Sequence, residues 1–112
     1  MGIKAEKAVQ NHKCWYPCSA AVLCAFAEDI QLTEEEARSR AMPYAGGRAG
    51  KCGAVMAAEE VLKARYGDEA EARIRDFEQR FMDRNGSVQC RALRRNCRKC
   101  VTDAASIAED ML

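Results

Sequence analysis

The chain has 112 residues, and 18 Lys and Arg residues against 17 Asp and Glu residues leave a formal net charge of +1. This near-neutral balance indicates neither nucleic acid nor another polyanion as a partner. The length fits one helical domain, residues 1–112, with a thin core. Alanines supply much of the apolar fraction of 48%, so helices packed through small side chains are expected.

The chain shows no signal for export or membrane insertion. Residues 1–6 lack the apolar stretch of a signal peptide. The longest weakly charged run, residues 14–27, is too short and too rich in small and polar side chains to span a bilayer. We therefore expect a cytoplasmic protein with no membrane partner.

Helix signals begin near the N-terminus. Residues 3–11 predict a short helix, which the run 11–16 interrupts. Pro17 then opens a second helix over residues 17–30, because proline is favoured at the first helical position. Apolar side chains recur along this segment at the spacing of one helix face, which supports the assignment.

A third helix follows a capping sequence. Thr33 and Glu36 have the spacing of a capping box, in which each side chain bonds to the backbone N–H of the other residue. This helix ends before Pro43. Residues 44–53 are rich in glycine but lack the spacing of a phosphate-binding loop, so we interpret them as a flexible approach to Cys52.

The second half of the chain continues the helical pattern. The fourth helix ends at Tyr66, with Gly67 as its C-terminal cap. Asp68 has the position of an N-cap for the fifth helix, which ends near Asn85 and Gly86.

Two further caps complete the pattern. Ser87 is expected to cap a short sixth helix, and Asn96 to cap a last helix whose apolar residues follow a 3.6-residue period. In no segment of the sequence do apolar and polar residues alternate over several positions, as they would in a β-strand. The pattern predicts an all-α fold, a small bundle of about five to seven helices.

The seven cysteines are the most informative residues. In a reducing compartment, clustered cysteines usually bind metals or carry redox chemistry; the alternative is that they are small buried hydrophobic residues. Backbone N–H groups and the helix dipole stabilise a thiolate at a helix N-terminus, so a thiol there is expected to have a pKa below the ordinary value of about 8.5. Four cysteines lie at predicted helix N-termini: Cys18, Cys52, Cys90 and Cys97.

Basic residues near these four cysteines are expected to lower the pKa of the thiols further. Lys13, Arg48 and Lys51 flank the first two sites. A second basic group surrounds the last two sites: Arg91, Arg94, Arg95, Arg98 and Lys99. This second group lacks the interleaved aromatic residues of a nucleic-acid surface.

The other three cysteines have different settings. Cys24 lies mid-helix and is interpreted as a packing residue, while Cys14 lies in a predicted turn and is ambiguous. Cys100 forms a Cys-x-x-Cys motif with Cys97, a spacing that brings two sulfurs together for a disulfide or a metal. The single histidine, His12, is interpreted as an exposed turn residue.

These features together resemble the C_GCAxxG_C_C family, which is named for its cysteine pattern. The resemblance covers residues 11–112. Ala57 stands where the family's Cys-Gly-Ala-x-x-Gly motif has its final glycine, a change that affects local packing. The resemblance implies a redox-active protein whose four family cysteines are Cys18, Cys52, Cys90 and Cys97. It leaves three extra cysteines: Cys14, Cys24 and Cys100.

Three functions remain open. A redox protein would use the four family cysteines for thiol–disulfide or electron-transfer chemistry, with a redox partner protein. A metal protein would hold an iron–sulfur cluster or a tetrahedral zinc with the same thiolates, and Cys100 is a further candidate ligand. A structural or adaptor bundle would use the cysteines only for packing. The first two functions both require the four cysteines to converge, and the sequence does not decide between them.

Overall fold

The computed structural model describes residues 2–112 and shows an all-α fold, as predicted. The α-helices in this range are α1 (Ile3–Lys13), α2 (Cys18–Ala25), α3 (Glu34–Ala41), α4 (Gly53–Tyr66), α5 (Ala70–Asn85), α6 (Cys90–Leu93) and α7 (Cys97–Met111). Short 3₁₀ helices lie between them at Glu28–Ile30, Met42–Gly47, Gly67–Glu69 and Arg94–Asn96. Among residues 2–112, every helix is too short or too polar to cross a bilayer.

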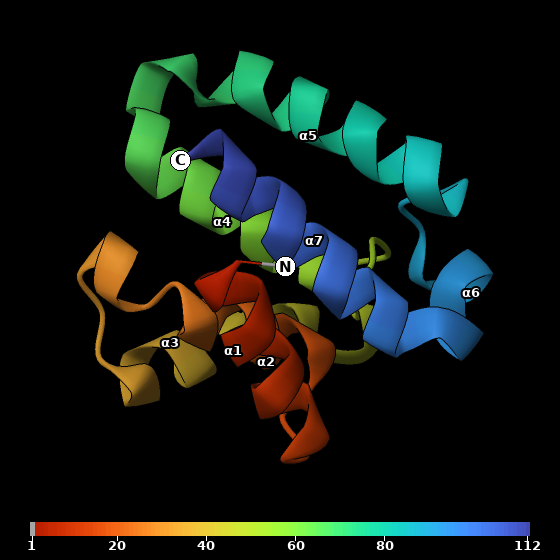
Figure 1. The fold of residues 1–112 in the computed structure, drawn as a ribbon, viewed down its shortest axis with the longest axis horizontal. Helices are drawn as coiled ribbons and strands as arrows, with labels where there is room; N and C mark the ends of the chain where they lie inside the picture. Colours follow the sequence, from red (N-terminus) through yellow and green to blue (C-terminus); the bar gives the residue numbers. More distant parts are fainter. Residues whose placement is uncertain (1) are drawn as a thin grey trace.

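Helices α4 and α7 form the centre of the fold. They lie side by side, with α5 along one flank and α1, α2 and α3 on the other (Figure 1). Helix α7 packs against α1, α2, α4 and α5, and α4 also packs against α2. These two helices therefore contact most of the others. The first turn of α4 is buried, whereas the first turn of α7 is exposed except at Cys100.

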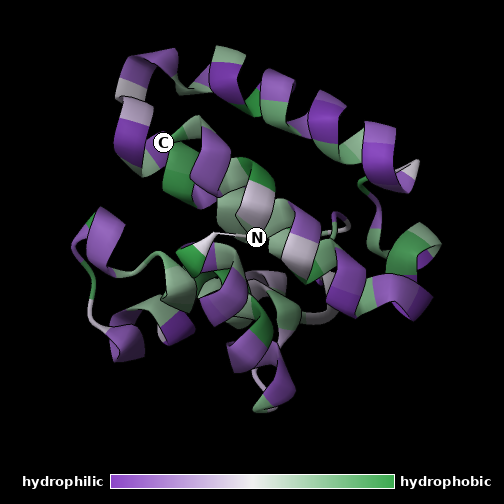
Figure 2. Ribbon diagram, in the orientation of Figure 1, coloured by the Kyte–Doolittle hydropathy of each residue, from purple (hydrophilic) through white to green (hydrophobic). Residues whose placement is uncertain are grey.

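Small side chains dominate the core, as the composition predicts. Alanines of α1, α2, α4 and α7 are fully buried and allow these helices to approach closely. The fully buried aromatic side chains are Phe26, Phe77 and Phe81. The last two project from α5, which is otherwise mostly hydrophilic along its length (Figure 2). Burial of this narrow apolar stripe holds α5 against α4 and α7.

The second helix is shorter than predicted. It begins at Cys18, with Pro17 as the N-cap residue, and it ends at Ala25. A separate 3₁₀ turn follows at Glu28–Ile30, and Gln31 then has a left-handed φ of 59°. The prediction of one continuous helix is wrong, because the apolar spacing continues across two helical segments and does not reveal the break between them.

Several helix boundaries are confirmed. Thr33 and Glu36 form the predicted capping box at the start of α3. Gly67 follows the last residue of α4 with a φ of 55°, and Gly86 follows α5 with a left-handed φ of 80°. A side chain with a Cβ atom is disfavoured at both positions, so these glycines end the helices cleanly.

Three predicted side-chain caps are wrong. Asp68 lies within the 3₁₀ turn Gly67–Glu69, and α5 begins after this turn without a side-chain cap. The hydroxyl of Ser87 accepts a hydrogen bond from the N–H of Gln89, before α6 begins. Asn96 precedes α7, but its side chain makes no capping hydrogen bond. The sequence locates these helix starts to within a few residues but does not identify what satisfies their N–H groups.

Candidate functional site

Each of the four predicted site cysteines lies at the start of a helix. Cys18, Cys90 and Cys97 are the first residues of α2, α6 and α7, and Cys52 is the N-cap residue of α4. The predicted placement is therefore confirmed. Within the described chain, none of these four helix starts carries a side-chain capping hydrogen bond, so no side-chain oxygen competes with the thiols for the first-turn N–H groups.

The segments that lead into Cys52 and Cys90 lie side by side although they are distant in the sequence. The residues that precede them form an isolated antiparallel bridge. The N–H of Cys52 donates to the carbonyl of Val88 at 2.7 Å, and the N–H of Cys90 donates to the carbonyl of Gly50 at 3.0 Å. These two bonds fix the start of α6 against the start of α4.

Two glycines allow the backbone to approach the thiols closely. A Cβ atom on Gly53 would lie 2.7 Å from Sγ of Cys18 and 2.9 Å from the carbonyl oxygen of Tyr44. A Cβ atom on Gly47 would overlap Sγ of Cys90, and Gly47 also has a positive φ of 78°. The glycine-rich segment therefore packs against the sulfurs, which differs from the flexible approach that the glycines alone suggest.

Five free thiols are linked through their effects on the pKa of Cys18, Cys52, Cys97 and Cys100, and we call them the thiol cluster: Cys18, Cys52, Cys90, Cys97 and Cys100. Burial and the charge of Cys52 raise the pKa of Cys18. Burial and the charges of Cys52 and Cys90 raise the pKa of Cys97. The structure thus gathers the four predicted cysteines into one region and adds Cys100 to them.

Cys52 is the thiol whose ionised form is stabilised. Its pKa is lowered to about 7, and the largest cause is a hydrogen bond with the Cys100 thiol. Burial opposes this effect, while backbone hydrogen bonds from Val55 and Ala54, in the first turn of α4, contribute to it. The ionised form of Cys52 is therefore favoured relative to that of an ordinary cysteine.

The lowered pKa predicted for Cys18 and Cys97 is wrong. Burial is the largest cause of the raised pKa in both cases, because a thiolate loses hydration when it is covered. Backbone hydrogen bonds from Gly46 and Ser19 lower the pKa of Cys18, but by less than burial and the charge of Cys52 raise it. A helix N-terminus is therefore not sufficient to ionise a thiol in this cluster.

Lys51 directly precedes Cys52 and was predicted to lower the pKa of that thiol, but its contacts are with other residues. Its ammonium group lies 3.2 Å from a carboxylate oxygen of Glu59 and also pairs with Glu78. Glu59 is buried, and burial raises its pKa to about 8. The ammonium of Lys51 compensates these carboxylates between α4 and α5, and it is not among the causes of the lowered pKa of Cys52.

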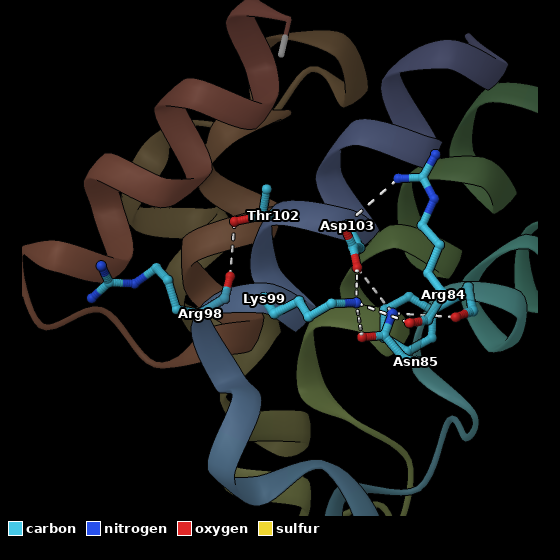
Figure 3. Close-up of polar contacts among 7 residues, drawn as sticks. Arg84, Asn85, Arg98, Lys99, Thr102 and Asp103 are labelled. Carbon is cyan, nitrogen blue, oxygen red and sulfur yellow. Dashed lines mark hydrogen bonds and ion pairs between the residues drawn. The ribbon is translucent and has the colours of Figure 1, made fainter.

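Lys99 and Arg98 also point to other partners. The Lys99 ammonium donates to Asp103 at 2.8 Å and to the side-chain oxygen of Asn85 at 2.9 Å, whereas Arg98 extends in the opposite direction (Figure 3). Nε of Arg98 donates to Nδ1 of His12 at 2.7 Å. Burial and the charge of Arg98 lower the pKa of His12. Neither residue is among the causes of the pKa shift of Cys97, so the predicted activation of that thiol is not supported. The charge of Lys99 does lower the pKa of Cys100, but burial and Cys52 outweigh it.

The extra cysteines fall into three settings. Cys24 is a packing residue as predicted: it is buried, its thiol donates to the carbonyl of Glu34 at 3.7 Å, and burial raises its pKa to about 11. Cys14 is exposed. Cys100 is buried, and both Cys52 and Cys97 raise its pKa. Its position four residues before the buried Ala104 is the sequence signal that places it on the inner face of α7.

The thiol cluster does not present a metal site in this structure. Within residues 2–112, no group of three or more His, Cys, Asp or Glu side chains is arranged to hold a metal ion. Thiolates are the ligands that zinc and iron–sulfur clusters prefer, but the sulfurs as placed do not converge on one point.

Comparison with known proteins agrees with the cysteine pattern. A family model described as "Putative redox-active protein (C_GCAxxG_C_C)" matches residues 16–111, a range that contains the whole thiol cluster. No curated protein and no solved structure matches the chain. Ala57, at the glycine position of the motif, is fully buried in α4.

Proposed function

The chain belongs to the C_GCAxxG_C_C family of redox-active proteins, and from this premise we propose that it exchanges electrons by cycling cysteines of the thiol cluster between thiol and disulfide. The observation that carries the proposal is the placement of the four family cysteines, all free thiols, at the starts of α2, α4, α6 and α7. The lowered pKa of Cys52 supports it. A thiolate attacks oxidants and disulfides, whereas a thiol does not. A second thiol nearby then completes the disulfide.

Exposure within the cluster suggests how electrons enter. Cys97 is exposed, and its thiol donates to the carbonyl of Arg94 at 3.2 Å. Cys18 and Cys90 are partly exposed, whereas Cys52 is buried. A redox partner protein would therefore meet the exposed edge of the cluster at Cys97, and small oxidants or reductants would reach Cys52.

A titration of thiolate absorbance in the ultraviolet tests the ionisation of Cys52. We expect the reduced protein to gain about one thiolate per chain around pH 7, and the Cys52→Ser variant to lose this step. Cys14→Ser is the matched control, because Cys14 is a free thiol that lies exposed outside the cluster. An unchanged titration in Cys52→Ser would contradict the assignment of the thiolate.

Differential alkylation tests the redox cycle itself. Treatment with a mild oxidant should protect cluster thiols from a small alkylating reagent, and a reductant should restore labelling, while Cys14 stays labelled. Mass spectrometry of the alkylated peptides gives the result. Labelling that requires prior removal of a metal would indicate metal binding instead. Labelling of the cluster only after unfolding, with no effect of the oxidant, would indicate a structural bundle.

A further inference from the structure

We propose that the surface around the thiol cluster is a docking site for a partner protein with an acidic surface, an inference that rests on the proposed function. Three segments of the chain carry this surface: residues 11–18, 44–53 and 87–99. They contain every cysteine of the thiol cluster except Cys100. We call them the docking segments and number them in chain order.

Contacts in the structure join the docking segments into one region. A Cβ atom on Gly53 would lie 2.7 Å from Sγ of Cys18, so the second segment packs against the first. The isolated antiparallel bridge joins the second segment to the third. The third segment returns to the first where Nε of Arg98 donates to Nδ1 of His12 at 2.7 Å. Segments that are distant in the sequence therefore share one part of the surface.

Basic residues are concentrated in the docking segments, although the chain as a whole has a net charge of only +1. The first segment contains one Lys or Arg residue, the second contains two and the third contains five, whereas all Asp and Glu residues lie elsewhere. Lys51 and Lys99 pair with carboxylates outside the segments. For the other six, residues 2–112 provide no ion-pair partner, and each is exposed: Lys13, Arg48, Arg91, Arg94, Arg95 and Arg98. This uncompensated positive charge favours an acidic surface on the partner.

Trp15 supplies an apolar anchor in the first docking segment. It is the single tryptophan of the chain, and it is 94% exposed. Its φ of 73° is left-handed, a conformation that a bulky residue rarely adopts. Its N–H donates to the carbonyl of His12 at 3.1 Å, which fixes the turn beside the residue that Arg98 contacts. A fixed turn that presents a tryptophan ring to solvent is typical of the anchor of a protein interface.

A protein fits this surface better than a nucleic acid or a membrane does. Exchange of electrons with thiols requires a partner that carries its own redox group, such as a disulfide. The third segment, the most basic of the three, also has no aromatic residue on which bases would stack. Cys97 is exposed and lies between Arg95 and Arg98 in the sequence, so an acidic surface that meets these arginines would bring its disulfide to the thiol.

Docking leads to thiol–disulfide exchange between the two proteins. The Cys97 thiol loses its proton, and its sulfur attacks one sulfur of the partner's disulfide. A bond forms between these two sulfurs, the partner's S–S bond breaks, and the other partner sulfur leaves and takes up the proton. A second thiol of the cluster then gives up its proton and attacks the Cys97 sulfur. The remaining partner sulfur leaves with that proton, so two electrons have passed from the cluster to the partner.

Two synthetic peptides that differ only in charge test the docking surface. Each contains one leucine and one cysteine activated as its 2-thiopyridyl disulfide, flanked by glutamates in one peptide and by lysines in the other. Exchange with the reduced full-length chain forms a mixed disulfide and releases 2-thiopyridone, which gives the rate. All proteins carry Cys14→Ser, because Cys14 is exposed next to Trp15. At low salt we expect the glutamate peptide to react about tenfold faster than the lysine peptide, and the ratio to fall towards one in high salt.

Charge-reversal variants show which basic residues cause the preference. In Arg94→Glu combined with Arg95→Glu, the preference for the glutamate peptide should disappear. Lys63→Glu combined with Arg65→Glu is the matched control, because it changes the net charge equally in the last turn of α4, at the opposite end of that helix from the thiol cluster. The control should keep the preference. The ratio between the two peptides is compared, so a change in the reactivity of the thiol itself cancels.

Trp15 is tested separately from the charges. Trp15→Ala should slow the glutamate peptide severalfold, whereas Ile3→Ala, which removes an exposed apolar side chain at the other end of α1, should not. The fluorescence of Trp15 gives a second measurement, since the chain has no other tryptophan. A glutamate peptide with serine in place of its activated cysteine should shift the emission to shorter wavelength at low salt.

The outcomes separate this inference from the proposed function. If the wild-type chain reacts equally fast with both peptides at low salt, the docking site is overturned, and exchange with the neutral reagent 2,2′-dithiodipyridine still supports the redox function. If the cluster thiols react with none of the three disulfides, both are overturned. If single-stranded DNA or anionic phospholipid vesicles inhibit the glutamate peptide as strongly per charge as the serine peptide does, the surface is a general anion site and the acidic protein partner is overturned.

Discussion

Helices α3 and α4 begin in chemically different ways, although the first turn of each helix leaves backbone N–H groups that need a hydrogen-bond acceptor. At α3, the hydroxyl of Thr33 accepts from the N–H of Glu36 at 3.1 Å, and the carboxylate of Glu36 accepts from the N–H of Thr33 at 2.9 Å. At α4, Cys52 occupies the N-cap position, and the N–H groups of Ala54 and Val55 stabilise its thiolate.

The difference lies in what covers each helix start. Thr33 and Glu36 are exposed, so water can replace either of them. Cys52 is buried, and burial alone would raise its pKa. The Cys100 thiol supplies the donor that water would otherwise provide. A buried helix start can therefore hold a reactive anion only where a neighbouring helix brings a proton donor to it.

Gly53→Ala is expected to have the largest effect, because it fills the space at the start of α4. Its Cβ atom would lie 2.7 Å from Sγ of Cys18 and 2.9 Å from the carbonyl oxygen of Tyr44. Overpacking of this kind costs typically about 1–3 kcal/mol, and we expect about 2–3 kcal/mol here because backbone as well as sulfur must move. Urea denaturation of the reduced protein measures the loss.

A double variant identifies which contact is responsible. Cys18→Ala removes the sulfur that the new methyl group would meet, so the two substitutions together should cost less than the sum of their separate effects. Rescue should be partial, since the carbonyl of Tyr44 remains. Strict additivity would show that the close approach of Gly53 to Cys18 does not determine this packing.

The two helix starts also show what can be predicted from sequence. The capping box of α3 is a local pattern, because both partners lie within one turn, and Thr33 and Glu36 are enough to identify it. The positions of Cys18 and Cys52 at helix starts follow in the same way from a neighbouring proline and glycine-rich segment. The all-α fold is predictable because such local signals recur along the chain.

The ionisation of the cysteines is not predictable in this way, because it depends on tertiary contacts. Cys18 and Cys52 have the same local setting, yet their pKa values shift in opposite directions. The difference arises from Cys100, which α7 brings to Cys52 from the far end of the sequence. Lys51 likewise has carboxylate partners on α4 and α5 that sequence proximity to Cys52 does not reveal.

Cys52→Ser is expected to change how stability depends on pH. The pKa of Cys52 is about 7 in the folded protein, below that of an unfolded cysteine. Above pH 7 the folded state therefore binds fewer protons than the unfolded state, and stability rises with pH; it is lost again as pH falls through 7. We expect Cys52 to contribute about 1 kcal/mol of stability between pH 6 and pH 8, measured as the change with pH of the difference between wild type and variant. Glu59, whose pKa is raised to about 8, makes the stability of both proteins fall over the same range and cancels in this difference.

Cys24→Ser is the matched control for this experiment. Cys24 is also a buried thiol, but its pKa is raised to about 11, so it stays protonated at both pH values. The control should shift the stability equally at pH 6 and pH 8, whatever the cost of the substitution. Urea denaturation under reducing conditions gives all four values. An equal difference between wild type and Cys52→Ser at pH 6 and pH 8 would contradict the contribution of the Cys52 thiolate.

Thr33→Ala is expected to have the smallest effect, and it tests the exposed member of the pair. Loss of an N-cap hydroxyl costs typically about 1 kcal/mol, and we expect about 0.5–1 kcal/mol here because water reaches the freed N–H group of Glu36.

Hydrogen bonds with Thr33 lower the pKa of Glu36, so the contribution of Glu36 is present above the pKa of an unfolded carboxyl and is lost as pH falls through the lowered value. The larger of these contributions comes from the backbone N–H of Thr33, which Thr33→Ala keeps, so the cost of the substitution should shrink only slightly in acid. The thiolate step near pH 7 should not move. Ser39→Ala, at an exposed position inside α3, should leave both stability and the Glu36 pKa unchanged. A shift in the Cys52 titration on Thr33→Ala would contradict the independence of the two helix starts, because no contact between them is needed to explain either one.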